Sequence, residues 1–316
     1  MNHLFNFFKN DKILITGASG LLGRNLFMLL KGQGLNVVGT YFSKNVEGLT
    51  YCDLTDLEQV KQITKGVKYI FLLAAKTYGA GVMKSNPSAL VTDTVSMNTN
   101  VLEAVKGTDI KKIIFVSSSV VYQESFKPLE EEDLDWNQNP YPLYMGVGWV
   151  KRYLEKICEF YSQLGLPINI VRLTSIYGKY DKYEEGKSHF VPAIIKRVLE
   201  KQDPLIIWGT GKDIKNMVYV DDLIRDMIKV MMYYDGVDAF NLCAENCLTV
   251  SEIVDIILDE VGYNIKPIYD ITKPGSIPYK NLVRNKLDSI VGKGSYKTFQ
   301  EGVKEVIEWM KGELNA

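Results

Sequence analysis

The sequence predicts an α/β fold in which a doubly wound parallel sheet is joined to a smaller C-terminal lobe. Two observations support this prediction. Short apolar runs alternate with amphipathic stretches through the first half of the chain, and this alternation ends near Gly178. Alternating strands and helices are typical of a parallel sheet with helices on both faces. A chain of 316 residues is long enough to bury the core of one or two such domains.

The expected strands are short and apolar, as parallel strands covered on both faces should be. They are Lys12–Ile15, Asn36–Thr40, Tyr69–Leu73, Ile113–Ser117 and Asn169–Leu173. The intervening patterns predict helices at Leu57–Ile63 and Ala89–Val105. Beyond Gly178, Val218–Asp222 and Phe240–Cys243 are expected to return as strands to the main sheet. The charged and aromatic segment Lys179–Lys187 is predicted to be a surface loop.

The composition argues against several classes of partner. A formal net charge of −1 gives no sign of a nucleic-acid or anionic-membrane partner. No apolar run approaches the length of a membrane span, and the N-terminus lacks a signal-type segment. The four cysteines are widely placed, and only His3 and His189 could complete a zinc site around Cys243 and Cys247. We therefore expect no metal and a location in the reducing cytoplasm.

A glycine-rich segment, TGASGLLG at residues 16–23, directly follows the first expected strand and precedes a helical pattern. Gly17 would permit the tight turn, Gly20 the close approach of a pyrophosphate, and Gly23 the packing of the helix. This context predicts a dinucleotide on a Rossmann fold. Residues 1–178, with 218–244, are then expected to form the dinucleotide domain. Residues 179–217 and 245–316 are expected to form mainly the substrate lobe.

The choice of dinucleotide depends on the end of the second strand. No acidic residue follows Gly39 to bind a ribose hydroxyl, yet no arginine or lysine stands at residues 17–23 or 39–43 to bind a 2′-phosphate. Lys44, the nearest cation, is equally well explained as a solvated loop residue. We therefore favour NAD without excluding NADP. Asp53 could contact the adenine or could cap a helix starting at Thr55.

Three further segments resemble the extended short-chain dehydrogenases/reductases that modify nucleotide sugars. VSSSVVY at 116–122 resembles the strand that ends in the catalytic serine, which would be Ser118. KRYLEKICEFY, beginning at Lys151, is similar to the family's catalytic-lysine helix. RLTSIYG at 172–178 resembles the segment beside the nicotinamide, with Ser175 where asparagine is commoner. The resemblance covers nearly the whole chain.

Within this family, three segments resemble the GDP-fucose synthase group. SHFVPAIIKR at 188–197 matches that group's spacing of a histidine and an arginine, here His189 and Arg197. WGTGKDIKNMVYVDD at 208–222 is similar to its diphosphate-and-base segment, with Lys215 where arginine is usual. TKPGSIPYK at 272–280 resembles a later substrate loop.

The resemblance implies a set of contacts on each side of the site. Catalytic roles would fall to Ser118, Lys151 and His189. Cofactor contacts would come from Gly17, Ser19, Gly20, Leu21, Leu22, Gly23, Thr40, Asp53, Leu54, Ala74, Ala75, Lys76, Ser117, Lys151, Ser175 and Ile176. Substrate contacts would come from Ser118, Ser119, Ser175, His189, Arg197, Trp208, Lys215 and Lys280. His189 could instead be a solvated or capping residue, and any single lysine could be a surface group.

Several positions depart from the family pattern. Val147 stands where the family has its catalytic tyrosine, four residues before Lys151. Val120 replaces the epimerising cysteine of the synthases, and Ser119 and Val120 replace the Asp-Glu pair of the 4,6-dehydratases. Elimination of water and two-base epimerisation each need a proton carrier that these positions lack. A water in the space at Val147 could relay the proton, or Tyr144 could reach in, although Tyr144 could simply pack in its turn.

These features predict an NAD-dependent oxidoreductase that converts carbon 4 of a GDP-manno-type heptose or deoxyhexose to a ketone for surface polysaccharide synthesis. Two alternatives are an isomerase of a 4-keto sugar that uses His189 and a catalytically silent sugar-nucleotide-binding protein. If the cofactor is retained, a second carbonyl compound would have to take the hydride back. The apolar face of Trp149, Tyr153, Ile157 and Tyr161 predicts a homodimer, since family members usually pair through this helix.

Overall fold

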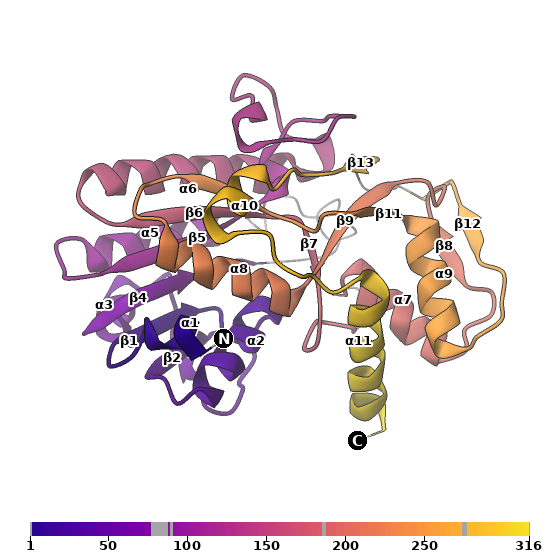
Figure 1. The fold of residues 1–316 in the computed structure, drawn as a ribbon, viewed down its shortest axis with the longest axis horizontal. Helices are drawn as coiled ribbons and strands as arrows, with labels where there is room; N and C mark the ends of the chain where they lie inside the picture. The colour runs from indigo at the N-terminus through magenta and orange to yellow at the C-terminus, as the bar shows by residue number, and fades with distance from the viewer. Residues whose placement is uncertain (1, 77–87, 89–90, 185–187, 274–276, 316) are drawn as a thin grey trace.

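Seven parallel strands form the centre of the molecule, in the order β10-β6-β5-β4-β1-β2-β3 (Figure 1). The structure is a computed structural model that describes residues 2–76, 88, 91–184, 188–273 and 277–315. The strands of this sheet are β1 (Lys12–Thr16), β2 (Val37–Tyr41), β3 (Thr50–Tyr51), β4 (Val67–Leu72), β5 (Lys112–Ser118), β6 (Ile168–Leu173) and β10 (Ala239–Leu242). Every residue of β6 is buried, including the polar Asn169 and Arg172.

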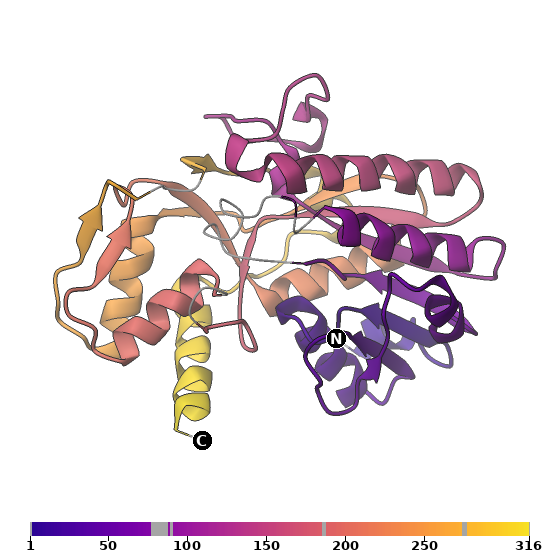
Figure 2. The same cartoon turned by 180° about the vertical axis from the view of Figure 1, so that it is seen from behind.

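Helices cover both faces of the sheet. One face carries α2 (Leu21–Gly32), α8 (Val220–Tyr233) and α10 (Asn285–Val291), with α1 (Asn2–Asn6) packed beside α8. The other face, turned to the viewer in Figure 2, carries α3 (Leu57–Ile63), α5 (Thr92–Val105) and α6 (Met145–Gln163). Each face has its own apolar core, so the sheet is buried on both sides.

A second lobe extends from the carboxyl ends of the strands (Figure 1). Its strands are β7 (Ser175–Tyr177), β8 (Ile206–Trp208), β9 (Ile214–Tyr219), β11 (Cys247–Thr249), β12 (Ile268–Asp270) and β13 (Tyr279–Lys280). Its helices are α7 (Phe190–Leu199), α9 (Val250–Val261) and α11 (Phe299–Leu314), which share a third apolar core. Short 3₁₀ turns at Ser119–Val121, Glu131–Asp133 and Pro142–Tyr144 connect elements of the first lobe.

The predicted fold class is confirmed, and the five strands predicted in the first half lie within two residues of their expected bounds. Leu57–Ile63 is a helix with the predicted ends. Residues 89 and 90 of the predicted helix Ala89–Val105 lie outside the described residues, and α5 begins at Thr92. Phe240–Cys243 falls on β10, which pairs with β6 at the sheet edge.

The prediction of a main-sheet strand at Val218–Asp222 is wrong. Val218 and Tyr219 end β9, which belongs to the small sheet of the second lobe, and Val220 begins α8. Two acidic residues, Asp221 and Asp222, lie in the first turn of that helix, where they complement the positive end of its dipole. The apolar run therefore spans the change from strand to helix.

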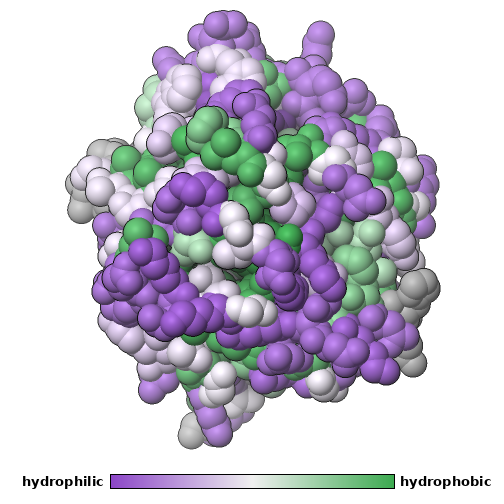
Figure 3. Space-filling model, turned by 90° about the vertical axis from the view of Figure 1, so that its left-hand side faces the viewer, coloured by the Kyte–Doolittle hydropathy of each residue, from purple (hydrophilic) through white to green (hydrophobic). Residues whose placement is uncertain are grey.

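At the end remote from the second lobe, apolar residues are interspersed with hydrophilic ones (Figure 3). Among the described residues, no helix is both long and apolar enough to cross a bilayer.

Candidate active site

The glycine-rich turn between β1 and α2 has the geometry that a dinucleotide requires. Gly17 has a φ of +67°, and its N–H donates to Thr40 Oγ1 at 3.2 Å. A Cβ on Gly23 would lie 2.5 Å from the Gly17 carbonyl oxygen, so only glycine lets α2 pack this closely. A Cβ on Gly20 would meet only that oxygen, at 3.5 Å. Gly20 thus borders open space at the start of α2, which no described side chain caps.

Other residues predicted to bind the cofactor lie around this turn. Thr40 is buried and holds the turn through its hydroxyl. The backbone N–H of Ala74 donates to Thr16 Oγ1 at 3.1 Å, which places the end of β4 against the end of β1. Lys76 forms an ion pair with Asp93 of α5. Ser19, Ala75 and Ile176 are partly exposed, whereas Leu21, Leu22 and Leu54 are buried in the apolar cores.

Asp53 does not cap a helix. Its carboxylate accepts hydrogen bonds from the backbone and hydroxyl of Thr55, at 2.9 and 2.7 Å. The cap of α3 is Asp56, which accepts from the backbone N–H groups of Glu58 and Gln59. Of the two explanations offered for Asp53, the helix cap is therefore wrong.

Ser118 and Lys151 both lie where α6 packs on the end of β5. Lys151 Nζ donates to the Val116 carbonyl oxygen at 2.7 Å, two residues before Ser118. Gly148 lets the start of α6 pack closely here, because a Cβ at this position would lie 2.7 Å from the Val120 carbonyl oxygen and 2.5 Å from Pro140 Cβ. The first turn of α6 thus lies directly against the turn that follows Ser118.

The buried surroundings of Lys151 disfavour its charge. Burial lowers the pKa of Lys151 to about 8, although Cys158 and Glu155 act in the opposite direction. One helical turn further on, Glu155 accepts from Ser117 Oγ and pairs with Arg172 at 2.8 Å. These bonds fix α6 to β5 and β6, which holds Ser118 and Lys151 in place.

No phenol lies at position 147, and the nearest predicted substitute is poorly suited. Tyr144 is half-buried in the 3₁₀ turn before α6, with its ring 6.3 Å from that of Tyr141. Burial, followed by the neighbouring Tyr141 and Asp213, raises the pKa of Tyr144. A raised pKa makes the phenolate scarcer at neutral pH, so Tyr144 is a weak proton acceptor.

Two lysines of the second lobe face the same region. Lys215 of β9 and Lys280 of β13 are partners in register across parallel strands. Lys280 Nζ lies 3.5 Å from Ser175 Oγ, and Lys215 Nζ donates to the Ile277 carbonyl oxygen at 2.6 Å. Burial, followed by repulsion from Lys215, lowers the pKa of Lys280 to about 8. A small cavity of about 20 Å³ has both Ser119 and Lys280 in its wall. The buried hydroxyl of Ser119 has no hydrogen-bond partner among the described residues.

The remaining substrate residues are spread over the second lobe. His189 precedes α7, and its ring is 39% exposed. Arg197, near the other end of α7, donates to Gln202 Oε1 and to the Ile206 carbonyl oxygen, each at 2.6 Å. The structure therefore shows Arg197 engaged within its own lobe. Trp208 ends β8 and is 53% exposed, which leaves its ring free to stack.

Comparison with known proteins identifies the family of this fold and site. The model of the NAD dependent epimerase/dehydratase family matches residues 13–243. The chain belongs to this family. The resemblance to nucleotide-sugar enzymes drawn from the motifs is thereby confirmed.

Relatives in sequence match nearly the whole length of this chain. GDP-mannose 3,5-epimerase of Arabidopsis thaliana is 26% identical over 97% of this chain and 84% of the relative. Putative GDP-L-fucose synthase 2 of the same plant is 27% identical over 95% of this chain and 92% of the relative. The solved UDP-glucose 4-epimerase of Thermotoga maritima superposes with a TM-score of 0.86 at 25% identity, covering 96% of this chain and 99% of that one.

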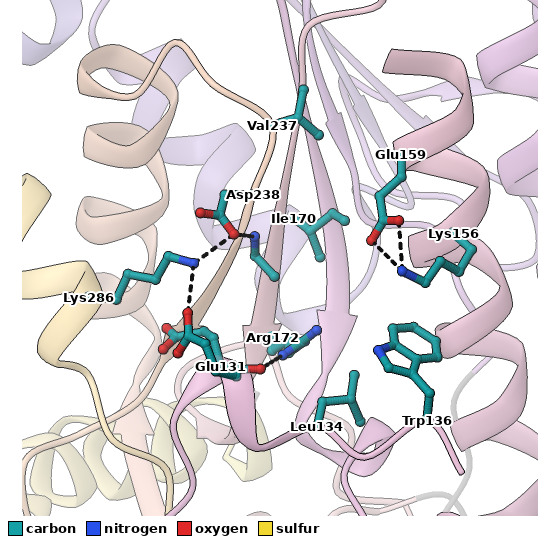
Figure 4. A pocket seen from close by; sticks show the side chains of 12 residues that line it. Glu131, Leu134, Trp136, Lys156, Glu159, Ile170, Arg172, Val237, Asp238 and Lys286 are labelled. Atoms are coloured by element: carbon teal, nitrogen blue, oxygen red, sulfur yellow. Dashed lines mark hydrogen bonds and ion pairs between the residues drawn. The ribbon is translucent and has the colours of Figure 1, made fainter. Parts of the chain in front are cut away.

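A larger cavity of about 280 Å³ lies apart from the predicted site residues. It opens between α6, β6 and β10, and none of the predicted site residues lines it. Its charged side chains point at one another (Figure 4): Lys156 binds Glu159 at 2.8 Å, and Lys286 binds Asp238 at 2.6 Å. These mutual ion pairs leave few unmatched charges to attract a ligand.

Sequence reasoning missed two carboxylates that support the site. Glu155 lies inside the lysine helix, four residues after Lys151, and that spacing could have placed it on the same helical face. Asp181 falls in the predicted surface loop Lys179–Lys187, of which residues 185–187 lie outside the described residues, but it is 4% exposed and contacts His189. Its charged neighbours in sequence hid this burial. Among the described residues, no group of three or more potential ligands could hold a metal ion.

Proposed function

We propose that this protein is a nucleotide-sugar oxidoreductase that oxidises the carbon-4 hydroxyl of a GDP-manno-type sugar to a ketone. The relatives named for GDP-mannose and GDP-L-fucose support a guanine nucleotide sugar. NAD is the favoured cofactor, and NADP is the alternative.

The residues of the first lobe fit a nicotinamide dinucleotide. The turn at Gly17–Gly23 would receive its pyrophosphate at the start of α2, and Lys151 and Ser175 would lie towards its reacting end. When bound, this group supplies the hydride acceptor. Ser118 would hold the sugar hydroxyl, and the positive charge of Lys151 would favour loss of the hydroxyl proton.

The observation that carries the proposal is the meeting of three segments at Lys280. This side chain contacts Ser175 and shares a cavity wall with Ser119, directly after Ser118. Lys215 already pairs with Asp213 at 3.5 Å, but burial and repulsion from Lys215 both disfavour the charge of Lys280, and an anion beside Lys280 would offset that cost. A nucleoside diphosphate would supply that anion and would bring the attached sugar to Ser118.

Oxidation is favoured over epimerisation because a second proton carrier is missing at the turn. Val120 offers no acid or base beside Ser118, and Val147 offers no phenol. An isomerase that relies on His189 remains the second candidate, since that ring is hydrogen-bonded to a carboxylate.

The test is turnover of GDP-manno-configured sugars by the purified protein, followed by mass spectrometry and by absorbance of the reduced nicotinamide. A keto product with reduced cofactor supports oxidation. An isomer without redox change supports the second candidate. Binding without any product would contradict both and would favour a silent binding protein.

A further inference from the structure

The loop between β7 and α7 places a buried carboxylate behind His189. Asp181 Oδ1 lies 2.8 Å from His189 Nδ1, and the Asp181 side chain is 1% exposed against 39% for the histidine. The backbone N–H of Lys182 also donates to Oδ1 at 2.8 Å. Asp181 Oδ2 is buried and has no hydrogen-bond partner among the described residues. The carboxylate is thus aimed at the ring and shielded from solvent.

The segment that leads into this pair packs against α2, the helix that follows the dinucleotide turn. Asn25 Nδ2, on α2, donates to the Lys179 carbonyl oxygen at 2.8 Å. The Arg24 guanidinium lies 4.3 Å from the centre of the Tyr180 ring. The segment that carries Asp181 is therefore attached to α2, the helix that Gly20 precedes, while His189 leads into α7 of the second lobe.

A capping role does not explain the histidine ring. His189 occupies the N-cap position of α7, but its side chain makes no capping hydrogen bond. Its Nδ1 faces Asp181 instead. A carboxylate can only accept hydrogen bonds, so in the neutral ring Nδ1 carries the hydrogen and Nε2 carries the lone pair.

We propose that Asp181 is a positioning residue that fixes His189 in the Nδ1–H tautomer, so that Nε2 accepts the proton released by the sugar hydroxyl. This role rests on the proposed oxidation. The O–H bond breaks, its proton moves to Nε2, and its electron pair stays on the oxygen as the carbonyl forms. The hydride leaves carbon 4 for the nicotinamide dinucleotide of the proposed function. Asp181 then stabilises the imidazolium, in the manner of a base with an orienting carboxylate.

The tautomer can be measured directly, because the chain has only two histidines. A His3→Gln protein labelled with ¹⁵N-histidine leaves His189 as the single imidazole in a long-range ¹H–¹⁵N spectrum. At a pH where the ring is neutral, we expect Nδ1 to show the shift of a protonated nitrogen and Nε2 that of an unprotonated one. A dominant Nε2–H tautomer overturns the proposal.

Asp181→Asn provides the matching functional test. The amide can donate to Nδ1, so the ring should move towards the Nε2–H tautomer. The value of kcat should then fall by about 10²–10⁴-fold, the range for loss of a general base, with KM little changed. Asp222→Asn is the control, because Asp222 is similarly buried and accepts the Lys297 N–H at 2.8 Å. It should leave the His189 tautomer unchanged. An unchanged tautomer and kcat in Asp181→Asn would refute the positioning role.

The spectrum also separates this inference from the proposed function. Addition of GDP-mannose should move the His189 ring signals, because the ring is expected to face the sugar site. If the protein shows the expected tautomer and this shift but oxidises no GDP sugar, the positioning of His189 is supported and the proposed oxidation is wrong. If the ring signals stay fixed at saturating GDP-mannose, the placement of His189 is wrong.

Discussion

Among single residues, Lys151 allows function and stability to be separated. In the folded protein its pKa is lowered to about 8, below its ordinary value in the unfolded chain. The unfolded state therefore binds more protons between about pH 8 and 10.4, and stability rises with pH across that window. At neutral pH the buried charge is a net cost to folding.

Lys151→Met should accordingly lower turnover by at least about tenfold without lowering the melting temperature at pH 7. Ser118→Ala should lower turnover by a similar factor. Lys156→Met is a control on the same helix, since Lys156 is exposed and forms an ion pair with Glu159. Turnover rates and calorimetric melting of the three variants check this prediction. Parental turnover in Lys151→Met would remove the lysine from the site.

The lowered pKa of Lys280 leads us to expect that nucleotide binding depends on pH. Its ammonium form attracts the diphosphate, and its pKa is lowered to about 8 by burial and by Lys215. The affinity for GDP should be constant below this pKa and fall towards tenfold per pH unit above it. Phosphate itself is already ionised there, with a second pKa of about 6. Isothermal titration between pH 7 and 9.5 measures the effect.

Lys280→Met should bind GDP more weakly and without this fall between pH 8 and 9.5. Lys273→Met, which changes an exposed lysine of the same segment, should behave like the parent. A parental pH profile in Lys280→Met would assign the titration to another group.

At the scale of elements, substitutions of Gly20 and Gly23, which lie where the turn after β1 leads into α2, should have different effects on stability and on cofactor binding. Gly20→Val should preserve the melting temperature, because a Cβ there meets only one atom, at 3.5 Å, but it should abolish dinucleotide binding by filling the pyrophosphate site. Gly23→Ala should destabilise the protein, because its Cβ would lie 2.5 Å from a backbone oxygen. Calorimetry of folding and of cofactor binding distinguishes the two. Unchanged cofactor affinity in Gly20→Val would contradict the assignment.

The elements that were predicted correctly are those whose pattern follows directly from burial. β1, β4, β5 and β6 are covered on both faces, so their apolar runs stand out in the sequence. The strand prediction for Val218–Asp222 failed because one apolar run crosses from β9 into α8, and periodicity is ambiguous over so few residues.

The site residues also differ in how far their sequence context reveals them. Gly17, Ser118 and Lys151 belong to local motifs, so their spacing reveals them. Asp181 and His189 are eight residues apart, but no local motif marks their contact, and the loop is held by a hydrogen bond from Asn25 of α2 to Lys179. Local polarity favoured a surface loop for that segment, and tertiary packing buried its carboxylate.

For the whole molecule, α6 leaves an aromatic face uncovered. Trp149 and Tyr153 are 40% and 49% exposed, whereas Ile157 and Tyr161 pack partly against the core. We expect two copies to bury this face in a C2-symmetric dimer. Light scattering at micromolar concentration should give twice the chain mass of 35.8 kDa, and Tyr153→Glu should shift the population towards monomer. A parent protein that remains monomeric would contradict this prediction.

The proposed oxidation of carbon 4 of a GDP sugar can be tested directly, and we propose in addition that the nicotinamide stays bound between turnovers. The most direct measurement incubates a known concentration of protein with GDP-manno-configured hexoses and heptoses and excess NAD, then traps ketones with borodeuteride. We predict one deuterium at carbon 4 in an amount close to the number of active sites, rising severalfold when a small keto acid is added to take the hydride back. Complete absence of deuterium from every GDP sugar, with or without the keto acid, would contradict the claim.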